Sequence, residues 1–253
     1  MPIGLKHKVV RVMRQPSVGR FLGNVFGERI PTRGCIIDTS DARVVPEVKA
    51  DLFFRFYESC EIRFVARYLR RDLDVVELGG SIGVVTCQIR KLIGSNCRMV
   101  CVEADSELVR LIGNNLKINR LDKQVSVVNA AIDYSGGETV CFAAGPSNSE
   151  GKVDQQDSRG CGLEVKTTTL SRVLSEYGLA DYALVCDIEG AEAGIIFRDR
   201  DAFLNCKQII IELHDTVFEG ERVGTGKMLN VLTRTHGFHL RDSYGPVCVL
   251  ERW

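Results

Sequence analysis

Short apolar segments alternate with amphipathic segments over most of the chain after residue 72. The apolar segments predict strands, and the segments between them carry apolar residues at helical spacing. The expected strands are Leu73–Leu78, Arg98–Glu103, Val125–Asn129, Tyr182–Asp187, Gln208–Leu213, Phe238–Arg241 and Val247–Glu251. The expected helices are Ile82–Ile93, Ser106–Ile118, Leu170–Glu176, a short one from Ala191, and Lys227–Arg234. This alternation predicts a three-layer α/β fold with a mostly parallel sheet covered on both faces.

The last two expected strands end the alternation differently. Only Asp242–Pro246 joins them, which is too short for a helical crossover, so the two strands must be antiparallel neighbours. The predicted seven-stranded sheet therefore closes with a C-terminal antiparallel hairpin. This ending argues against a dehydrogenase-type Rossmann domain, which continues with crossover helices. The polar, glycine-rich segment 145–162 is expected to be a mobile loop.

The strongest chemical motif is DVVELGGSIG, residues 74–83, where the first strand enters the first helix. Gly79 and Gly83 let the backbone approach a ligand and let the helix pack close to the strand. The N–H groups of the helix N-terminus, expected near Ser81, can bind an electron-rich ligand group. The motif lacks the GxGxxG spacing of a pyrophosphate loop, and the acid Glu77 suits a cationic methionine moiety better than a phosphate.

A second acid stands in register with this loop. Glu103 ends the next strand, 20 residues after Gly83, where a carboxylate can accept hydrogen bonds from both ribose hydroxyls of a nucleoside. The third strand is followed by small and apolar residues, Ala131 and Ile132, suited to flank an adenine ring, with Asp133 near its amino group. Together these residues predict an adenosyl cofactor site.

Two residues are candidates for the reaction itself. Asp187 ends the fourth strand and His214 the fifth, so both side chains should face the crevice at the carboxyl ends of the strands. His214, with an ordinary pKa of about 6.5, is expected to act as a general base at neutral pH, with Asp187 orienting the acceptor or the base. A histidine that only holds a strand end is the structural alternative.

Hard oxygen ligands also gather in this part of the sequence. Asp187, Glu189, Glu192 and Asp215 could hold Mg²⁺, although acids at the first turn of a helix more often complement its dipole. The expectation is therefore a site without a metal, and metal dependence stays open as the alternative.

Composition limits the partners and the setting. The 33 basic and 33 acidic side chains balance, so no global field attracts nucleic acid or an anionic membrane. The ten cysteines form no CxxC pair and several lie in apolar runs, which predicts buried, reduced thiols. No stretch is long and apolar enough for a membrane span or a secretion signal. We expect a cytoplasmic protein with a small-molecule partner.

The first 44 residues differ from the rest. Residues 1–33 hold seven Lys or Arg and one acid, Glu28, with apolar residues at helical spacing from Leu5 to Met13. The predicted division is a basic N-terminal extension over 1–44 and a catalytic domain over 45–253. The extension could be a solvated arm, a cover over the active site, or a membrane-surface attachment.

The ordered motifs resemble one known family. The series DVVELGGSIG, VEADSELVRLIGNNLKIN, VVNAAID, TTTLSRVL, LVCDIEGAE and IIIELHD resembles the FkbM-type methyltransferase family over about residues 47–253. FYESCEIRFVARYL is similar to the leading helix of that family. Gly80 and Ser81 stand where the family commonly has Ala and Asn, but Ser81 is still small and can cap the helix.

The resemblance implies a Rossmann-like methyltransferase fold and transfer of a methyl group from S-adenosylmethionine, typically to oxygen on sugars or natural products. The expected cofactor-binding residues are Glu77, Gly79, Ser81, Gly83, Glu103, Ala131, Ile132 and Asp133. Two alternatives remain: a cofactor-binding domain without turnover that serves as a partner protein, and a nicotinamide-dependent oxidoreductase on a related fold. Methylation of a protein or nucleic acid gains no support from the balanced charge.

Overall fold

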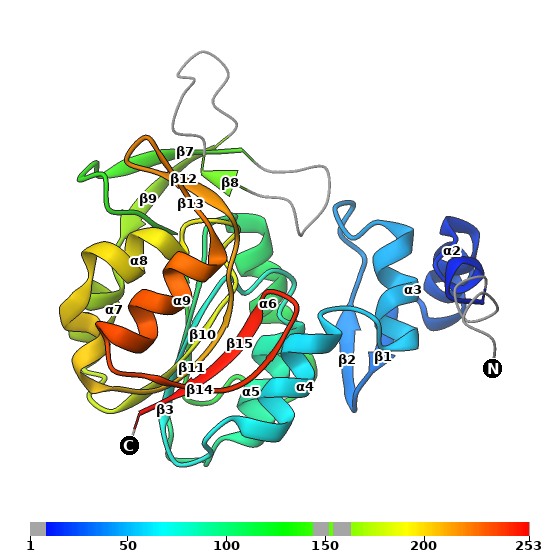
Figure 1. Ribbon diagram of the computed structural model, residues 1–253. Coiled ribbons are helices and arrows are strands. Elements are labelled where there is room, and N and C mark those ends of the chain that lie inside the picture. The colour runs from blue at the N-terminus through cyan, green and yellow to red at the C-terminus, as the bar shows by residue number, and fades with distance from the viewer. Residues whose placement is uncertain (1–8, 144–151, 154–162, 253) are drawn as a thin grey trace.

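A seven-stranded sheet in the order β14-β15-β11-β10-β3-β4-β5 forms the centre of the molecule (Figure 1). The computed structural model describes residues 9–143, 152–153 and 163–252. The strands are β3 (Asp74–Leu78), β4 (Met99–Glu103), β5 (Val125–Asn129), β10 (Tyr182–Cys186), β11 (Cys206–Glu212), β14 (His239–Tyr244) and β15 (Val247–Glu251). Strands β5, β4, β3, β10 and β11 are parallel, and β15 is antiparallel to both β11 and β14. The predicted mostly parallel sheet with a closing hairpin is confirmed.

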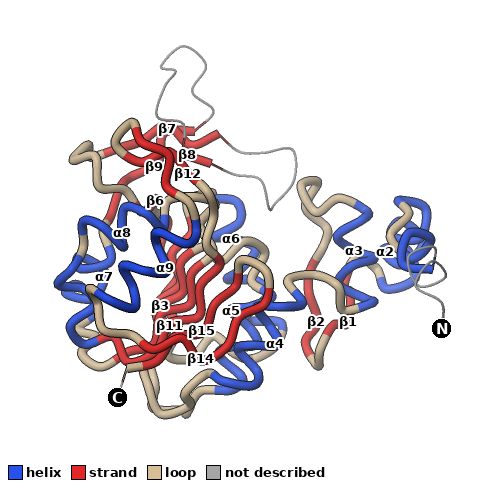
Figure 2. The backbone as a smooth tube through the Cα atoms, in the orientation of Figure 1, coloured by secondary structure: helices blue, strands red, loops and turns tan. Residues whose placement is uncertain are grey.

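Helices cover both faces of this sheet, as Figure 2 shows. One face carries α4 (Ser59–Tyr68), α5 (Val84–Leu92) and α6 (Ser106–Ile118), and the other α7 (Leu170–Tyr177), α8 (Glu192–Arg198) and α9 (Thr225–Arg234). Successive residues of β10 point to opposite faces: Val185 packs in the core under α4 to α6, and Leu184 in the core under α7 to α9. The continuous apolar runs in the sequence reflect this burial on both sides.

The chain order gives the sheet a switch point. It proceeds from β3 outward through β4 to β5, and then returns to β10 on the other side of β3. In open α/β sheets, ligands bind in the crevice outside the carboxyl ends of the strands at such a point. The fold therefore places the candidate site where β3 and β10 end.

The N-terminal elements lie beside the sheet domain (Figure 1). They are α2 (Pro16–Phe26), the hairpin of β1 (Arg29–Thr32) and β2 (Cys35–Asp38), and α3 (Pro46–Phe54), which packs on α2 and β1. Asn115 of α6 joins the two parts, because its side chain accepts a hydrogen bond from Asp38 N at 2.7 Å and donates one to Ile82 O at 2.8 Å. The predicted division at residue 44 and the role of the extension remain predictions.

Besides the β1-β2 hairpin, two small sheets were missed by the sequence interpretation. One is ordered β6-β9-β7-β8, and the other is the antiparallel pair β12-β13. Their bounds are β6 (Ala131–Ile132), β7 (Thr139–Ala143), β8 (Lys152–Val153), β9 (Leu163–Thr168), β12 (Thr216–Phe218) and β13 (Glu221–Val223), and a 3-10 helix, η1, spans Arg200–Asn205. Four of these strands, β6, β8, β12 and β13, have only two or three residues, too few to show a periodic pattern. Apart from β8, the mobile loop expected over 145–162 lies outside the described residues.

The thiol expectation holds with one exception. Among the described cysteines eight are free, and six of these are buried: Cys35, Cys87, Cys101, Cys186, Cys206 and Cys248. Cys141 is disulfide-bonded, so the expectation of reduced thiols is wrong at this position. Within the described part of the chain, no helix combines the length and apolar character needed to cross a membrane.

Candidate active site

The loop between β3 and α5 is held in an unusual backbone conformation. Ser81 has a φ of +47°, and α5 begins only at Val84, with Gly83 (φ +81°) as its N-cap and no side-chain cap. The expected helix start near Ser81, and Ser81 as its cap, are therefore wrong. Ser81 lies two residues before the N-cap Gly83, so it stands outside the helix and does not cap it. Ser81 instead donates its backbone N–H to Glu103 Oε2 at 2.8 Å, and its hydroxyl lies 3.0 Å from that of Tyr57.

Gly79 brings the ends of β3 and β10 together. Its φ is +89°, and a Cβ atom at this position would lie 1.8 Å from the carbonyl oxygen of Asp187. The absence of a side chain therefore allows the glycine loop to lie directly on the residue that follows β10. The two halves of the site, one on each side of the switch point, meet at this contact.

Glu103 organises the cofactor side of the crevice. It is 7% exposed, and its Oε1 accepts a hydrogen bond from Asp105 N at 2.9 Å while Oε2 accepts the one from Ser81 N. Each carboxylate oxygen has two lone pairs, so Glu103 can accept further hydrogen bonds from a ligand. Glu103 thus already connects the glycine loop to the end of β4.

The predicted adenine-flanking residues adjoin Glu103 only in part. Ala130 N donates to Glu103 O, and the next two residues, Ala131 and Ile132, are buried and pair with β9. Asp133 Oδ2 accepts hydrogen bonds from the backbone N–H and hydroxyl of Ser135. The structure therefore places Ala130, the residue before Ala131, against Glu103 and engages one oxygen of Asp133 in a local turn.

Glu77 is a buried acid without a hydrogen-bond partner. It is 1% exposed, and neither carboxylate oxygen has a partner of hydrogen-bonding geometry. Burial raises its pKa to about 7; the nearby Thr86 hydroxyl and Cys101 thiol oppose this shift, and the charge of Glu103 adds to it. An unpaired carboxylate in such a place is costly unless a proton or a cation joins it.

His214 lies at the centre of a group of carboxylates on the other half of the site. Its Nδ1 is 2.9 Å from Oε1 of Glu192, a side chain that is 0% exposed. Its Nε2 faces three more acids, at 3.9 Å from Asp187 Oδ1, 3.8 Å from Glu189 Oε2 and 3.7 Å from Glu212 Oε1. The sequence placed Asp187 and His214 together correctly, but Glu192, not Asp187, holds the ring.

These neighbours change the proton affinities. The hydrogen bond that His214 donates to Glu192 raises the pKa of His214 to about 9, and the charges of Asp187 and Glu189 add to this effect. Burial raises the pKa of Asp187 to about 7, with a further contribution from the charge of Glu212. The expected ordinary pKa of His214 is therefore wrong: the ring is protonated at neutral pH in the free protein.

The segment that leads into α4 also contributes residues to the site, and the sequence did not predict this. Tyr57 is buried against Ser81, and Glu58, with a φ of +42°, is an acid whose pKa is raised to about 8, first by burial and then by the charge of Asp187. Glu61 is also buried, and its pKa is raised for the same reasons. The only signal was an acid at a helix start, which is common on surfaces and does not indicate a site.

A metal could be held by only part of the acidic set that the sequence suggested. Among the described residues, ligand atoms of Asp187, Glu189 and His214 lie within 4.8 Å of one another. Asp215 belongs elsewhere, because its Oδ1 accepts a hydrogen bond from Thr225 N at the start of α9.

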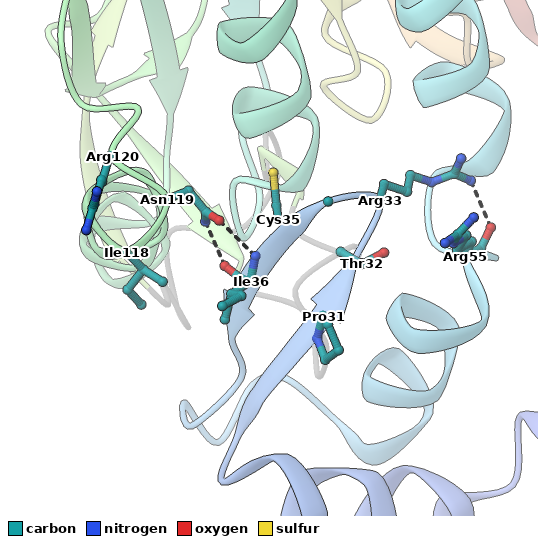
Figure 3. Close-up of a pocket in the computed structure, with 10 residues that line it drawn as sticks. Pro31, Thr32, Arg33, Cys35, Ile36, Arg55, Ile118, Asn119 and Arg120 are labelled. Carbon is teal, nitrogen blue, oxygen red and sulfur yellow. Dashed lines mark hydrogen bonds between the residues drawn. The ribbon is translucent and has the colours of Figure 1, made fainter.

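A separate open pocket lies at the N-terminal hairpin. Figure 3 shows Arg33 and Arg55 on one side of it and Asn119 and Arg120 on the other. Its volume is about 470 Å³, and its lining contains none of the predicted site residues: Pro31, Thr32, Arg33, Gly34, Cys35, Ile36, Arg55, Ile118, Asn119 and Arg120. This pocket is therefore not the candidate active site.

The sheet order and the glycine loop at the switch point define a Rossmann-like α/β domain, with acids at or near the ends of β3 and β4. A family model described as the methyltransferase FkbM domain matches residues 77–240. The chain belongs to this family, and S-adenosylmethionine is its methyl donor.

Solved structures show only distant likeness. A protein of the NADB-Rossmann superfamily from Streptococcus agalactiae has 10% identity and a TM-score of 0.45, covering 76% of this chain and 68% of that one. The precorrin-6y C5,15-methyltransferase of Geobacter metallireducens has 15% identity and a TM-score of 0.42, with 76% and 87% covered. An O-methyltransferase of Bacillus cereus in complex with S-adenosylhomocysteine has 11% identity and a TM-score of 0.42, with 76% and 78% covered. The comparison with curated proteins found no match.

Proposed function

We propose that this chain transfers the methyl group of S-adenosylmethionine to a hydroxyl group of a sugar or another small natural product. The observation that carries the proposal is the contact of two half-sites at one switch point. Glu103 and the glycine loop lie on one side, Asp187 and His214 lie on the other, and Gly79 joins them. A donor bound by the first half would present its methyl group to an acceptor at the second.

The residues present fit the cofactor. Glu103 has free lone pairs for the ribose hydroxyls, and the unpartnered Glu77 carboxylate suits the positive charge of the methionine part. Gly79, Ser81 and Gly83 form the loop beside it, and Ala131 and Ile132 supply an apolar surface for the adenine. Asp133 remains a proposed neighbour of the adenine amino group. The cofactor supplies an electrophilic methyl group on a sulfonium.

The acceptor hydroxyl must lose its proton as the new bond forms. The methyl group passes from sulfur to oxygen, the sulfonium becomes a neutral thioether, and the hydroxyl proton needs an acceptor. In a site without a metal this role falls to His214 Nε2, with Asp187 beside it to orient the hydroxyl. Because His214 is protonated at neutral pH, such an enzyme would gain activity as the pH rises towards 9.

Cofactor binding tests the first half of the proposal. Isothermal titration of the full chain with S-adenosylmethionine and S-adenosylhomocysteine, with NAD as the control, should give micromolar binding of the first two only. Glu103→Ala should abolish that binding, because it removes the acceptor for Ser81 N and for the ribose. Binding of NAD instead would favour an oxidoreductase.

Turnover tests the second half. Methyl transfer to a panel of hydroxylated sugars should fall at least 100-fold in His214→Gln, while cofactor affinity stays within twofold. His239→Gln is the matched control, because His239 is exposed on β14. Cofactor binding without turnover on any acceptor, in both the native and variant proteins, would favour a binding domain without catalysis.

A further inference from the structure

We infer that Asp187, Glu189 and His214 bind one divalent transition-metal ion, which would coordinate the acceptor hydroxyl. The inference rests on the proposed methyl transfer and adds the ion that would activate its acceptor. It also selects three ligands from the larger acidic set that the sequence suggested.

The possible ligand atoms of these three residues converge on one place. His214 Nε2, Asp187 Oδ1 and Glu189 Oε2 come from three separate places in the chain and lie within 4.8 Å of one another. Atoms bound to one cation at about 2.1 to 2.4 Å lie roughly 3 to 5 Å apart, so these separations fit one ion. One imidazole and two carboxylates suit Mn²⁺, Fe²⁺ or Zn²⁺ better than Ca²⁺.

A buried carboxylate fixes the far side of the histidine ring. Glu192 is 0% exposed; its Oε1 holds His214 Nδ1 at 2.9 Å, while its Oε2 is buried without a partner. A metal-binding histidine usually donates its other ring N–H to a carboxylate, which fixes the ring and directs the remaining nitrogen to the metal. Asp187 Oδ1, which faces that nitrogen, is also buried without a hydrogen-bond partner.

The carboxylates around His214 give this place an excess of negative charge. Asp187, Glu189, Glu192 and Glu212 surround one imidazole, so even a protonated ring leaves a net negative charge in a partly buried place. Buried carboxylates are normally paired with a cation or coordinate a metal.

The chemistry follows from coordination. A bound ion would coordinate the acceptor hydroxyl and lower its pKa; the hydroxyl proton would pass to solvent, the oxygen would attack the methyl carbon, and the carbon–sulfur bond would break. The products are a methyl ether and a neutral thioether. His214 then holds the ion, which takes over the ionisation of the hydroxyl.

The test is a titration of the full chain with Mn²⁺ after dialysis against EDTA, with free Mn²⁺ followed by electron paramagnetic resonance. One site per chain is expected, and binding should weaken at least tenfold in Asp187→Asn and in Glu189→Gln. Glu221→Gln is the matched control, because Glu221 is an exposed acid of β13. Circular dichroism of each variant separates a lost ligand from a lost fold, and Glu189, which is 32% exposed, can be replaced with little risk to folding.

No Mn²⁺ or Zn²⁺ binding, or equal binding in the native protein and both ligand variants, would overturn the inference. Titration of the same metal-free protein with S-adenosylmethionine keeps the two proposals apart. If the cofactor binds but no metal does, the inference fails and the metal-free mechanism with His214 as base stands. If neither binds, the proposed function fails as well.

Discussion

Replacing Glu77 by glutamine should make the protein more stable and a weaker binder of its cofactor. The pKa of the buried Glu77 carboxyl is raised from 4.5 to about 7. The folded state therefore holds an extra proton between these two values, and the free energy of unfolding falls as the pH rises through that window. One pKa unit corresponds to about 1.36 kcal/mol, so ionised Glu77 costs the folded state about 3 kcal/mol above pH 7.

A glutamine side chain carries no charge at any pH and keeps nearly the same shape as glutamate. In urea unfolding, the free energy of unfolding of Glu77→Gln should therefore exceed that of the native protein by about 3 kcal/mol at pH 8, and the two values should differ little at pH 5. In calorimetry the variant should bind S-adenosylmethionine roughly 10- to 100-fold more weakly, since a charged partner contributes about 1.5 to 3 kcal/mol. The substitution should weaken binding of S-adenosylhomocysteine less, because this ligand lacks the sulfonium charge.

A matched substitution isolates the effect. Glu107→Gln removes an exposed carboxylate from the first turn of α6, and it should change the free energy of unfolding by less than about 0.5 kcal/mol at both pH values. The reasoning would be refuted if Glu77→Gln gave no gain at pH 8, or the same gain at pH 5 as at pH 8. Either result would mean that Glu77 is not a buried group that ionises near neutral pH.

Three further predictions concern the contacts around the site. In chelator-treated protein, an NMR titration should show His214 protonating near pH 9, and Glu192→Gln should lower this pKa by at least one unit, because the partner that raises it is gone; an unchanged value would contradict the assigned contact. Asn115→Ala should lower the free energy of unfolding by roughly 2 to 4 kcal/mol in urea, since it leaves the buried Ile82 carbonyl and the half-buried Asp38 N–H unpaired, and a loss below about 1 kcal/mol would contradict the role given to this residue. Gly79→Ala should lower the melting temperature sharply and abolish cofactor binding, because its Cβ would lie 1.8 Å from a carbonyl oxygen. Gly113→Ala, in the middle of α6 with open space around it, should instead stabilise the protein by about 0.5 to 1 kcal/mol.

Most of the large sheet could be predicted because its strands are buried on both faces. Such strands are continuous apolar runs, and helix periodicity marks the segments between them. The helix Ser106–Ile118 has the predicted bounds, and it starts after Asp105, which caps it through its side chain. The helix after the glycine loop was placed too early, because nothing in the sequence shows that Ser81 adopts a left-handed conformation.

The candidate site could likewise be predicted only in part. The acids at or near strand ends, Glu77, Glu103 and Asp187, could be proposed because strand ends can be located from the pattern, and parallel strands end at one edge. The partner of His214 was not found, because Glu192 becomes its neighbour only when β10 and β11 pair and α8 packs beside them. Its raised pKa follows from this contact and has no signature in the local sequence.

By itself, the sequence determined the layer order, the direction of the main strands, the closing hairpin and the family, because each depends on local pattern and on motif order along the chain. Only the tertiary structure decided which carboxylates surround His214 and which backbone N–H groups hold Glu103. It alone decided that Glu77 is buried without a partner. Burial, proton affinity and ligand convergence are set by residues distant in the chain, and their free energies arise when the layers pack and water leaves.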